Sequence, residues 1–434
     1  MISPLRSSGV LLVHFSSLHN YGTGMMGINL LHHLRLRRPG LDVFASDFSG
    51  EEDIASLRSE LGEEDGGIAF KREDYLALER RLRVSTKLRK LSFVPGLRRF
   101  LDALPARLAS RYRHVVFLGG DGLWEGYYKD GEVPLLKFFQ EVEKHSRLYL
   151  VGQTMAPFSN PRNVERMRSL QNTVIYARDE AGWRYLTEEI GMSPERAKRS
   201  SDLALLPLPR QDEPGLWKEV SGRYGLAPGE YVTLVMSGMA SYYTKNVEDF
   251  EQAWVALIRR LLAERRLEGK KLCILVHVFS VFGGKPEREV ARTVFGMLSD
   301  AERERVVLID EEVKPTRARL VLGNSLFVIT SRMHASVSSY QMGAPAVVLA
   351  YGPKYKGLVG EGLRCGDLLV VADDSGKWTS GSIVGEVMEK ADYVLENRDA
   401  LCTRIREAVA AEAGHVEQAM DDLAQRIAPW CKRG

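Results

Sequence analysis

Residues 326–343 read LFVITSRMHASVSSYQMG, and this stretch decides the fold that we expect. Its first five residues are apolar and rich in β-branched side chains, which predicts a buried strand. Ser331 is a suitable N-cap, so a helix is predicted over residues 333–342, with Gly343 just after its end. Another apolar run follows at residues 345–350, so the stretch predicts a strand–helix–strand crossover in a parallel sheet.

Two polar side chains follow the first of these strands directly. Arg332 and His334 are expected at the carboxyl end of the strand, on the first turn of the helix. In an open α/β sheet, ligands bind at that edge. The helix amides, the helix dipole and a guanidinium group all favour an anion there, which predicts an anion site. The alternative is that both residues are solvated or cap the helix.

The rest of the chain repeats this alternation of strands and helices. Strands are predicted at residues 10–15, 41–45, 114–118, 147–152 and 173–177, and, after a proline-rich linker at 207–215, at 231–236, 271–278, 306–310 and 368–371. This order predicts an α/β protein with two doubly wound, Rossmann-like domains facing a cleft. We place an N-terminal α/β domain at residues 1–207, a C-terminal one at 216–382, and a C-terminal helical tail at 383–434 that packs across both.

Other residues suited to ligand binding also follow predicted strands. They are Asn20, Tyr21, Gly120, Asp121 and Arg178 in the first half, and Tyr242, His277 and Lys354 in the second. A local ion pair of Arg178 with Asp179 is an equally weighted alternative to ligand binding. For His277, which lies in an apolar strand, the alternative is a buried core histidine.

The amino-acid composition limits which classes of protein this chain can belong to. The 434 residues are 44% hydrophobic and 27% charged, which is ordinary for a soluble globular protein. A net charge of +3 is too small to argue for nucleic acid. The four cysteines are far apart and form no metal-type pair, so we expect free thiols in a reducing compartment. With no signal peptide or membrane-spanning stretch recognised, we expect a cytoplasmic protein.

One segment stands out by its charge. Residues 71–113 are expected to be mostly helical, and they interleave many arginines and lysines with leucines. Such a face suits the anionic inner surface of a membrane, or an acidic acceptor. The alternative is a solvated helix face.

The order of these motifs resembles that of the polysaccharide pyruvyl transferase family. The matching pieces are Asn20-Tyr-Gly22, Gly119-Gly120, Arg178-Asp179, Asp202, Arg332-x-His334 and Tyr351-x-Pro-Lys354-x-x-Gly357. The pair Arg332-x-His334 with the lysine loop is the most specific part. Thr23 stands where the family often has an acidic residue, and neither the basic insert nor the long tail is clearly part of the shared pattern.

The resemblance implies a glycosyltransferase-B-like fold and a phosphoenolpyruvate-dependent ketal pyruvyltransferase. Such an enzyme moves the enolpyruvyl unit onto two hydroxyls of a sugar, in a polysaccharide or its lipid-linked precursor, and releases phosphate. Phosphoenolpyruvate is then a co-substrate, and no cofactor, metal or nucleic acid is expected. The alternatives are a nucleotide-sugar-dependent glycosyltransferase and a non-catalytic relative that binds a sugar or an anion.

The same resemblance suggests a role for each candidate residue. His334, Arg332 and Arg178 are expected to be catalytic. The donor is expected to contact Arg178, Arg332, Met333, His334, Lys354 and His277, and the saccharide acceptor to contact Asn20, Tyr21, Gly120, Asp121 and Tyr242. His334 suits proton transfer near neutral pH, and the arginines suit a carboxylate and a phosphate.

Overall fold

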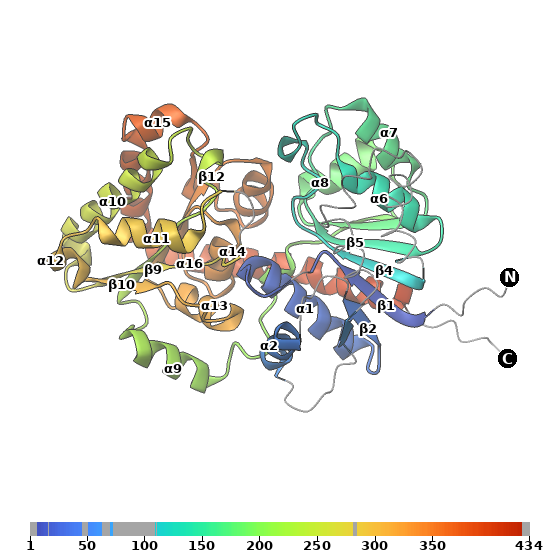
Figure 1. Cartoon of the computed structure of the whole chain (residues 1–434), viewed down its shortest axis with the longest axis horizontal. Coiled ribbons are helices and arrows are strands. Elements are labelled where there is room, and N and C mark those ends of the chain that lie inside the picture. Colours follow the sequence, from blue (N-terminus) through green and yellow to red (C-terminus); the bar gives the residue numbers. More distant parts are fainter. Residues whose placement is uncertain are drawn as a thin grey trace, which may run out of the picture. The chain divides into compact units, whose positions relative to one another are not determined.

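The computed structural model describes residues 7–15, 17–45, 51–62, 70–72, 109, 111–280 and 284–427. The chain divides into two compact units (Figure 1). Unit 1 is Met1–Ser17, Met26–Leu203 and Gly414–Gly434, and unit 2 is Leu18–Met25 and Ala204–Ala413. A short piece from the beginning of the chain therefore belongs to the unit that contains most of its second half.

Unit 1 is built on a parallel sheet of seven strands in the order β3-β2-β1-β4-β5-β6-β7. The strands are β1 (Ser7–Val13), β2 (Val43–Ala45), β3 (Phe70–Arg72), β4 (Tyr112–Leu118), β5 (Arg147–Gln153), β6 (Thr173–Ala177) and β7 (Ala197–Arg199). Its helices are most of α1 (Tyr21–Arg37), then α2 (Glu51–Leu61), α6 (Pro134–Glu143), α7 (Pro161–Ser169) and α8 (Glu180–Arg184), followed by the π-helical turn Tyr185–Glu189.

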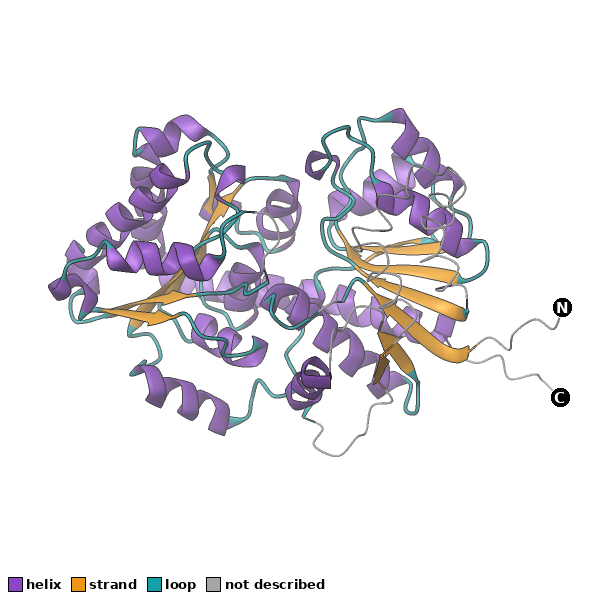
Figure 2. Cartoon of the chain, in the orientation of Figure 1, coloured by secondary structure: helices purple, strands orange, loops and turns teal. Residues whose placement is uncertain are grey.

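The central strands of unit 1 are buried on both faces, as expected for a parallel sheet covered by helices. All five residues of β6 are buried. On one face, Phe117 of β4 meets Phe139 of α6 edge to face, with ring centroids 5.0 Å apart. Figure 2 shows the helices flanking the strands of this sheet.

Unit 2 repeats the design with six parallel strands in the order β10-β9-β8-β11-β12-β13. They are β8 (Tyr231–Val235), β9 (Lys271–Leu275), β10 (Val306–Ile309), β11 (Phe327–Thr330), β12 (Ala346–Ala350) and β13 (Leu369–Val371). The helices are α9 (Pro214–Tyr224), α10 (Val247–Ala263), α11 (Glu287–Gly296), α12 (Asp300–Arg303), α13 (Pro315–Gly323), α14 (Met333–Gln341), η6 (Tyr355–Gly362), α15 (Ser375–Thr379) and most of α16 (Ser382–Ile427).

Both sheets have the doubly wound strand order, in which the chain reverses its direction of growth between two central strands. In unit 2 this switch point lies between β8 and β11, which pair in parallel from Phe327 with Val232 to Thr330 with Val235. In unit 1 the equivalent neighbours are β1 and β4. The doubly wound fold predicted from the sequence is therefore confirmed.

Three local predictions were wrong. Arg332, and not Ser331, is the N-cap residue of α14, because the Ser331 hydroxyl is hydrogen-bonded across to β8. The small residues after the first strand predict a loop at 16–24 and a helix from about residue 25 to 36, but α1 already begins at Tyr21, because the Asn20 side chain accepts from the amides of Gly22 and Thr23. The second half of the predicted loop at 351–357 is the start of a π-helix, η6.

Two further expectations concern membranes and the tail. Of the basic insert at 71–113, residues 73–108 and 110 lie outside the described residues. Within the described part of the chain, no helix combines the length and the apolarity needed to cross a membrane. The predicted tail is largely the long helix α16, whose residues up to Ala413 group with unit 2 and whose later residues group with unit 1.

Candidate functional site

The loops after β8 and β11 are joined at the switch point of unit 2. The Ser237 amide donates to Ser331 Oγ at 2.7 Å, and the Ser331 amide donates to the Val235 carbonyl at 2.9 Å. The hydroxyl of Tyr243 also donates to the Ser331 carbonyl. These bonds engage the amide, the hydroxyl and the carbonyl of Ser331. They therefore fix the backbone position of the next residue, Arg332.

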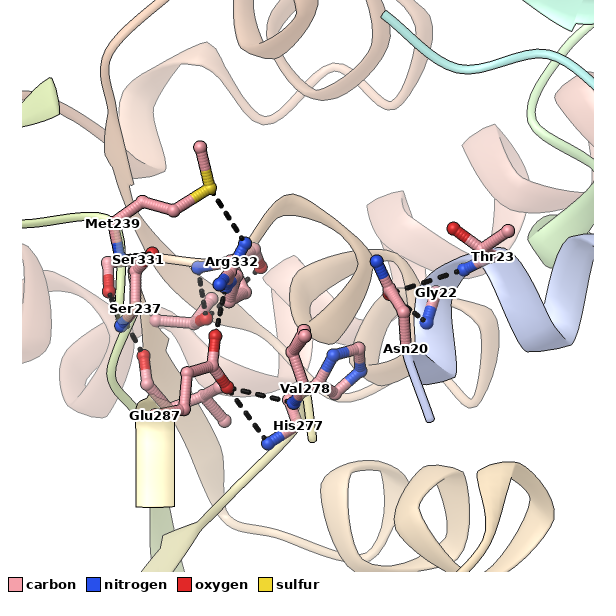
Figure 3. A network of polar contacts seen from close by, with 12 residues as sticks. Asn20, Gly22, Thr23, Ser237, Met239, His277, Val278, Glu287, Ser331 and Arg332 are labelled. Carbon is pink, nitrogen blue, oxygen red and sulfur yellow. Dashed lines mark hydrogen bonds and ion pairs between the residues drawn. The ribbon is translucent and has the colours of Figure 1, made fainter. Parts of the chain in front are cut away.

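Arg332 is anchored by a buried carboxylate. Its amide donates to Thr330 Oγ1 at 2.8 Å, its Nε donates to Glu287 Oε1, and its Nη1 lies 3.5 Å from the sulfur of Met239 (Figure 3). The Arg332 side chain is 19% exposed and that of Glu287 only 2%. Burial works against the positive charge, but the Glu287 carboxylate outweighs it and raises the pKa of Arg332.

Glu287 is the first residue of α11 and uses both carboxylate oxygens. While Oε1 accepts from Arg332, Oε2 accepts from the amides of His277 at 3.1 Å and Val278 at 2.9 Å. Burial raises the pKa of Glu287 above its usual value, and Arg332 and the two amides act in the opposite direction. The first-turn position also favours the carboxylate, because a helix dipole is positive at that end.

The segment after β9 is also hydrogen-bonded to the turn at residues 19–22, where α1 begins. Asn20 forms an isolated antiparallel bridge with Val278, the Tyr21 amide donates to the His277 carbonyl at 3.3 Å, and the Phe279 amide donates to the His19 carbonyl at 2.7 Å. All of these residues belong to unit 2. Asn20 and Tyr21 were predicted in the N-terminal half, but the structure groups them with Arg332 and His277.

Gly22 brings this turn against His334. A Cβ atom at Gly22 would lie 2.4 Å from Cγ of His334, which is closer than real Cβ contacts allow. His334 lies on the first turn of α14 and is partly exposed. The glycine of the Asn20-Tyr-Gly22 motif is therefore needed for close packing against the histidine.

His277 is enclosed. It is 1% exposed, and its Nε2 has no hydrogen-bond partner among the described residues. The ring of Tyr21 meets it edge to face, with centroids 5.4 Å apart. Burial, reinforced by the nearby His334, Arg332 and Arg319, holds the pKa of His277 well below its usual value. The imidazole is therefore neutral at physiological pH.

The predicted lysine lies in a cluster of tyrosines. Lys354 Nζ donates to the Tyr351 hydroxyl at 2.9 Å and stands 4.8 Å from the centroid of the same ring. Tyr351 in turn lies 5.1 Å, centroid to centroid, from both Tyr242 and Tyr243. Since Tyr243 bonds the Ser331 carbonyl, this cluster connects with the Arg332 segment. Met333, which was also predicted as a donor contact, is buried, and only 4% of its surface is exposed.

The remaining candidates lie in unit 1 and form a second group. Arg178 is 1% exposed, and its Nη1 donates to Asp202 Oδ2 at 3.0 Å. The Arg178 amide donates to the Gln153 carbonyl, and the Gln153 side chain donates to the Gly120 carbonyl at 2.9 Å. Asp121 accepts from the Tyr127 hydroxyl. The alternative weighed for Arg178, an ion pair, does exist, but its partner is Asp202, while Asp179 caps α8 through the Gly182 amide.

Sequence reasoning missed Glu287. It lies 45 residues before Arg332 in the chain, and nothing local marks the two as partners. The one available signal was a glutamate at a helix start, shortly after the strand end that carries His277. Among the described residues, no group of three or more His, Cys, Asp or Glu side chains could hold a metal ion.

Comparison with known proteins gives the chain a family. The model of the family described as polysaccharide pyruvyl transferase matches residues 20–353. The chain belongs to the polysaccharide pyruvyl transferase family. The match runs from the Asn20 turn to the residue before Lys354, so it includes Arg332, His334 and Glu287. As a member of this family, the protein is a transferase of polysaccharide biosynthesis.

One curated relative extends along almost the whole chain. The amylovoran biosynthesis protein AmsJ of Erwinia amylovora is 20% identical over 424 residues, which cover 93% of this chain and 96% of AmsJ. The predicted family resemblance is thus confirmed.

Solved structures agree on the fold. The UDP-GlcNAc 2-epimerase of Neisseria meningitidis bound to UDP-GlcNAc has a TM-score of 0.57 at 11% identity, covering 96% of this chain and 98% of the epimerase. The S. aureus MnaA–UDP structure has a TM-score of 0.55 at 13% identity, covering 95% and 97% of the two chains. At these identities the similarity shows the glycosyltransferase-B-like fold alone.

Proposed function

We propose that this protein transfers the enolpyruvyl unit of phosphoenolpyruvate onto two hydroxyls of one sugar, forming a pyruvate ketal and releasing phosphate. The observation that carries the proposal is the anchored Arg332 beside His334 at the switch point of unit 2, in a chain matched by the family model over residues 20–353. In doubly wound sheets, ligands bind outside the carboxyl ends of the strands at this point.

The donor needs cationic groups of fixed direction. Phosphoenolpyruvate carries a carboxylate and a phosphate, and a guanidinium binds either through paired hydrogen bonds. Among the described residues, the contacts of the Arg332 guanidinium engage Nε and Nη1, which leaves Nη2 for a ligand. Amides in the first turn of α14, at Met333 and His334, would support the same anion. Lys354 is proposed to stabilise the leaving phosphate, because a cation there lowers the barrier to departure.

The reaction requires one proton on carbon. Protonation of the methylene carbon makes C2 electrophilic, the first hydroxyl adds, and the second hydroxyl then displaces phosphate. Of the two hydroxyl protons, one balances the proton placed on the methylene and the other leaves with phosphate. None of these steps uses a metal or a resident cofactor.

His334 is the proposed acid–base group. It lies two residues beyond Arg332, on the first turn of α14, and the residue is partly exposed although its Nε2 atom is buried. His277 is enclosed and its pKa is held well below the usual value, so it suits a neutral hydrogen-bonding role through Nε2. A general base or acid works best when its pKa is near the working pH.

The acceptor is proposed to be a saccharide of an exopolysaccharide or its lipid-linked precursor. The name of the relative, an amylovoran biosynthesis protein, supports this direction. Asn20, Tyr21 and Tyr242 in unit 2 and Gly120 and Asp121 in unit 1 remain the proposed acceptor contacts. Arg178 remains a proposed donor residue, in its ion pair with Asp202. A cytoplasmic enzyme with its basic segment near anionic lipid also remains a proposal.

The test separates donor binding from turnover. Thermal unfolding is followed with phosphoenolpyruvate or with UDP-GlcNAc, since a ligand that binds only the folded state raises the midpoint. Phosphate release is then measured with phosphoenolpyruvate and a panel of saccharide acceptors. A midpoint shift with phosphoenolpyruvate and acceptor-dependent phosphate release are expected. A shift with UDP-GlcNAc alone would contradict the proposal and favour nucleotide-sugar chemistry.

A further inference from the structure

One buried carboxylate connects the donor arginine with the turn before α1. Glu287 is 3% exposed, and no charged side chain other than Arg332 bonds it among the described residues. Its three hydrogen bonds come from the Arg332 side chain and from two consecutive backbone amides. Burying a carboxylate this deeply costs free energy unless a cation and hydrogen-bond donors compensate for the lost water, as these partners do.

The first consequence concerns the direction of Arg332. The residue is the N-cap of α14 with extended backbone angles (φ −119°, ψ 119°), so its backbone is not yet helical where the helix begins. The Glu287 contact on Nε then restricts the guanidinium plane, and the sulfur of Met239 flanks Nη1. Figure 3 shows the guanidinium between Glu287 and Met239. A long side chain held in this way loses less entropy when it binds an anion.

The second consequence concerns the segment after β9. Glu287 Oε2 holds the amides of His277 and Val278, and the same two residues hold the turn through the Asn20–Val278 bridge and the Tyr21–His277 bond. That turn places Gly22 against His334. Both the donor arginine and the packing of the proposed acid–base histidine therefore depend on the position of one side chain.

We propose that Glu287 is a positioning residue for the transfer reaction: it orients Arg332 toward the donor and ties it to the turn at Asn20–Gly22. The inference rests on the proposed function, because it takes the anion at Arg332 to be phosphoenolpyruvate. Glu287 acts through Arg332 and has no contact with substrate of its own.

The decisive variant is Glu287→Gln, which keeps the size of the side chain. Its amide oxygen still accepts from the two backbone amides, but its NH2 group then faces the Nε–H of Arg332, so two donors meet and the anchor is lost. We expect kcat/KM for phosphoenolpyruvate to fall roughly 10²-fold, the scale seen for a small misplacement of a binding group. The KM for phosphoenolpyruvate should rise, while the KM for the acceptor changes little.

A matched control and a double-mutant cycle separate positioning from stability. The control is Asp367→Asn in the same unit, because Asp367 pairs with Arg404 at 2.8 and 2.9 Å and neither residue belongs to the proposed site. Donor affinity, by calorimetry, should be unchanged in this control. In the cycle, Glu287→Gln combined with Arg332→Lys should weaken donor binding about as much as Arg332→Lys alone, because residues that act as one unit are not additive.

The outcomes are distinguishable. If the wild-type protein binds no phosphoenolpyruvate, the proposed function fails and this inference fails with it. If the wild type binds and Glu287→Gln binds equally well, or the two losses simply add, the positioning role alone is overturned. Should Glu287→Gln not fold, Glu287→Asp supplies the same comparison, since it keeps the charge but withdraws it by one methylene group.

Discussion

Arg332 contributes a fixed positive charge at the carboxyl end of β11. Because its charge is held beside Glu287 and is mostly removed from water, truncation leaves the donor anion and the Oε1 atom of Glu287 without their cationic partner. We expect Arg332→Ala to weaken phosphoenolpyruvate binding by about 2–5 kcal/mol, the range for removing one member of a buried charge pair. Calorimetry measures the change directly.

The control for that variant is Arg404→Ala. Arg404 bonds Asp367 at 2.8 and 2.9 Å in the same unit, so its loss tests the general effect of removing an ion pair. Equal losses of donor affinity in the two variants would mean that Arg332 affects folding and not the donor.

His334 and His277 differ in what they can do with a proton. His334 is partly exposed, whereas His277 is enclosed and its pKa lies well below the usual value. We expect His334→Gln to lower turnover roughly 10²–10⁴-fold, the usual contribution of one acid–base group, with little change in donor affinity. His277→Gln should retain more turnover. The reverse result, a dead His277 variant beside an active His334 variant, would exchange the two roles.

The sequence was sufficient to place Arg332 and His334 just beyond the end of a strand, because both closely follow an apolar run and a strand end is a local signal. Glu287 had no such signal: its contact with Arg332 arises only when α11 and β11 are packed in one unit. The same limit applies to Arg178. Its position after β6 was predicted, but its pairing with Asp202 depends on a contact between residues 24 positions apart.

The first turns of α1 and α14 meet without space for a side chain at Gly22. Since a Cβ there would lie 2.4 Å from His334 Cγ, Gly22→Ala must displace the imidazole or the turn. We expect turnover to fall roughly 10²-fold, because a displacement of about 1 Å at a reacting group has that effect. Steady-state kinetics with phosphate release measures it, and circular dichroism checks that the fold is kept.

Gly24→Ala is the matched control on the same helix. A Cβ at Gly24 would lie 3.1 Å from a side-chain atom of Pro315, so the fit is tight but involves no site residue. If Gly24→Ala lost as much activity as Gly22→Ala, the effect would belong to α1 as a whole and not to the contact with His334.

Element prediction succeeded where one local signal dominated. β6 was placed at its observed bounds, Thr173–Ala177, because five buried residues in a row have few alternatives. The cap of α14 was misplaced by one residue because the Ser331 hydroxyl, an ordinary N-cap, was used across the sheet by the Ser237 amide. Similarly, the start of α1 was missed because Asn20, Gly22 and Thr23 read as loop residues, while together they cap the helix.

In the molecule as a whole, the two units share one strand order apart from the additional edge strand β7 of unit 1, but the chain is not divided between them at a single point. The sequence suggested one boundary near the proline-rich linker, and the linear order of strands supports that picture. The units instead exchange short pieces: Leu18–Met25 groups with unit 2, and the end of α16 groups with unit 1. Hydrophobic periodicity reports which faces are buried and not which unit buries them, so this exchange was not predictable from patterns alone.

The stability of the molecule should depend on pH through histidines enclosed in unit 1. His114 of β4 is 5% exposed, and its Nδ1 lies 3.1 Å from the Tyr149 hydroxyl. Burial, reinforced by Arg113 and Arg147, lowers the pKa of His114 to about 4. An unfolded histidine titrates near 6.5, so between these values the unfolded chain binds a proton that the folded chain does not.

Stability therefore falls as the pH drops from about 6.5 toward 4, and the contribution of this one group is on the order of 3 kcal/mol when fully developed. His33 of α1, whose pKa burial also lowers to about 4, adds a loss of the same sign in the same window. Urea unfolding of the wild type, His114→Gln and His33→Gln at pH 7.5, 6, 5 and 4.5 measures both contributions. Each variant should lose less stability over this range than the wild type, even where its stability at pH 7.5 is lower. A His114→Gln curve parallel to the wild-type curve would mean that His114 titrates in the folded protein as it does in the unfolded chain, with the Tyr149 hydroxyl accepting a hydrogen bond from the protonated imidazole.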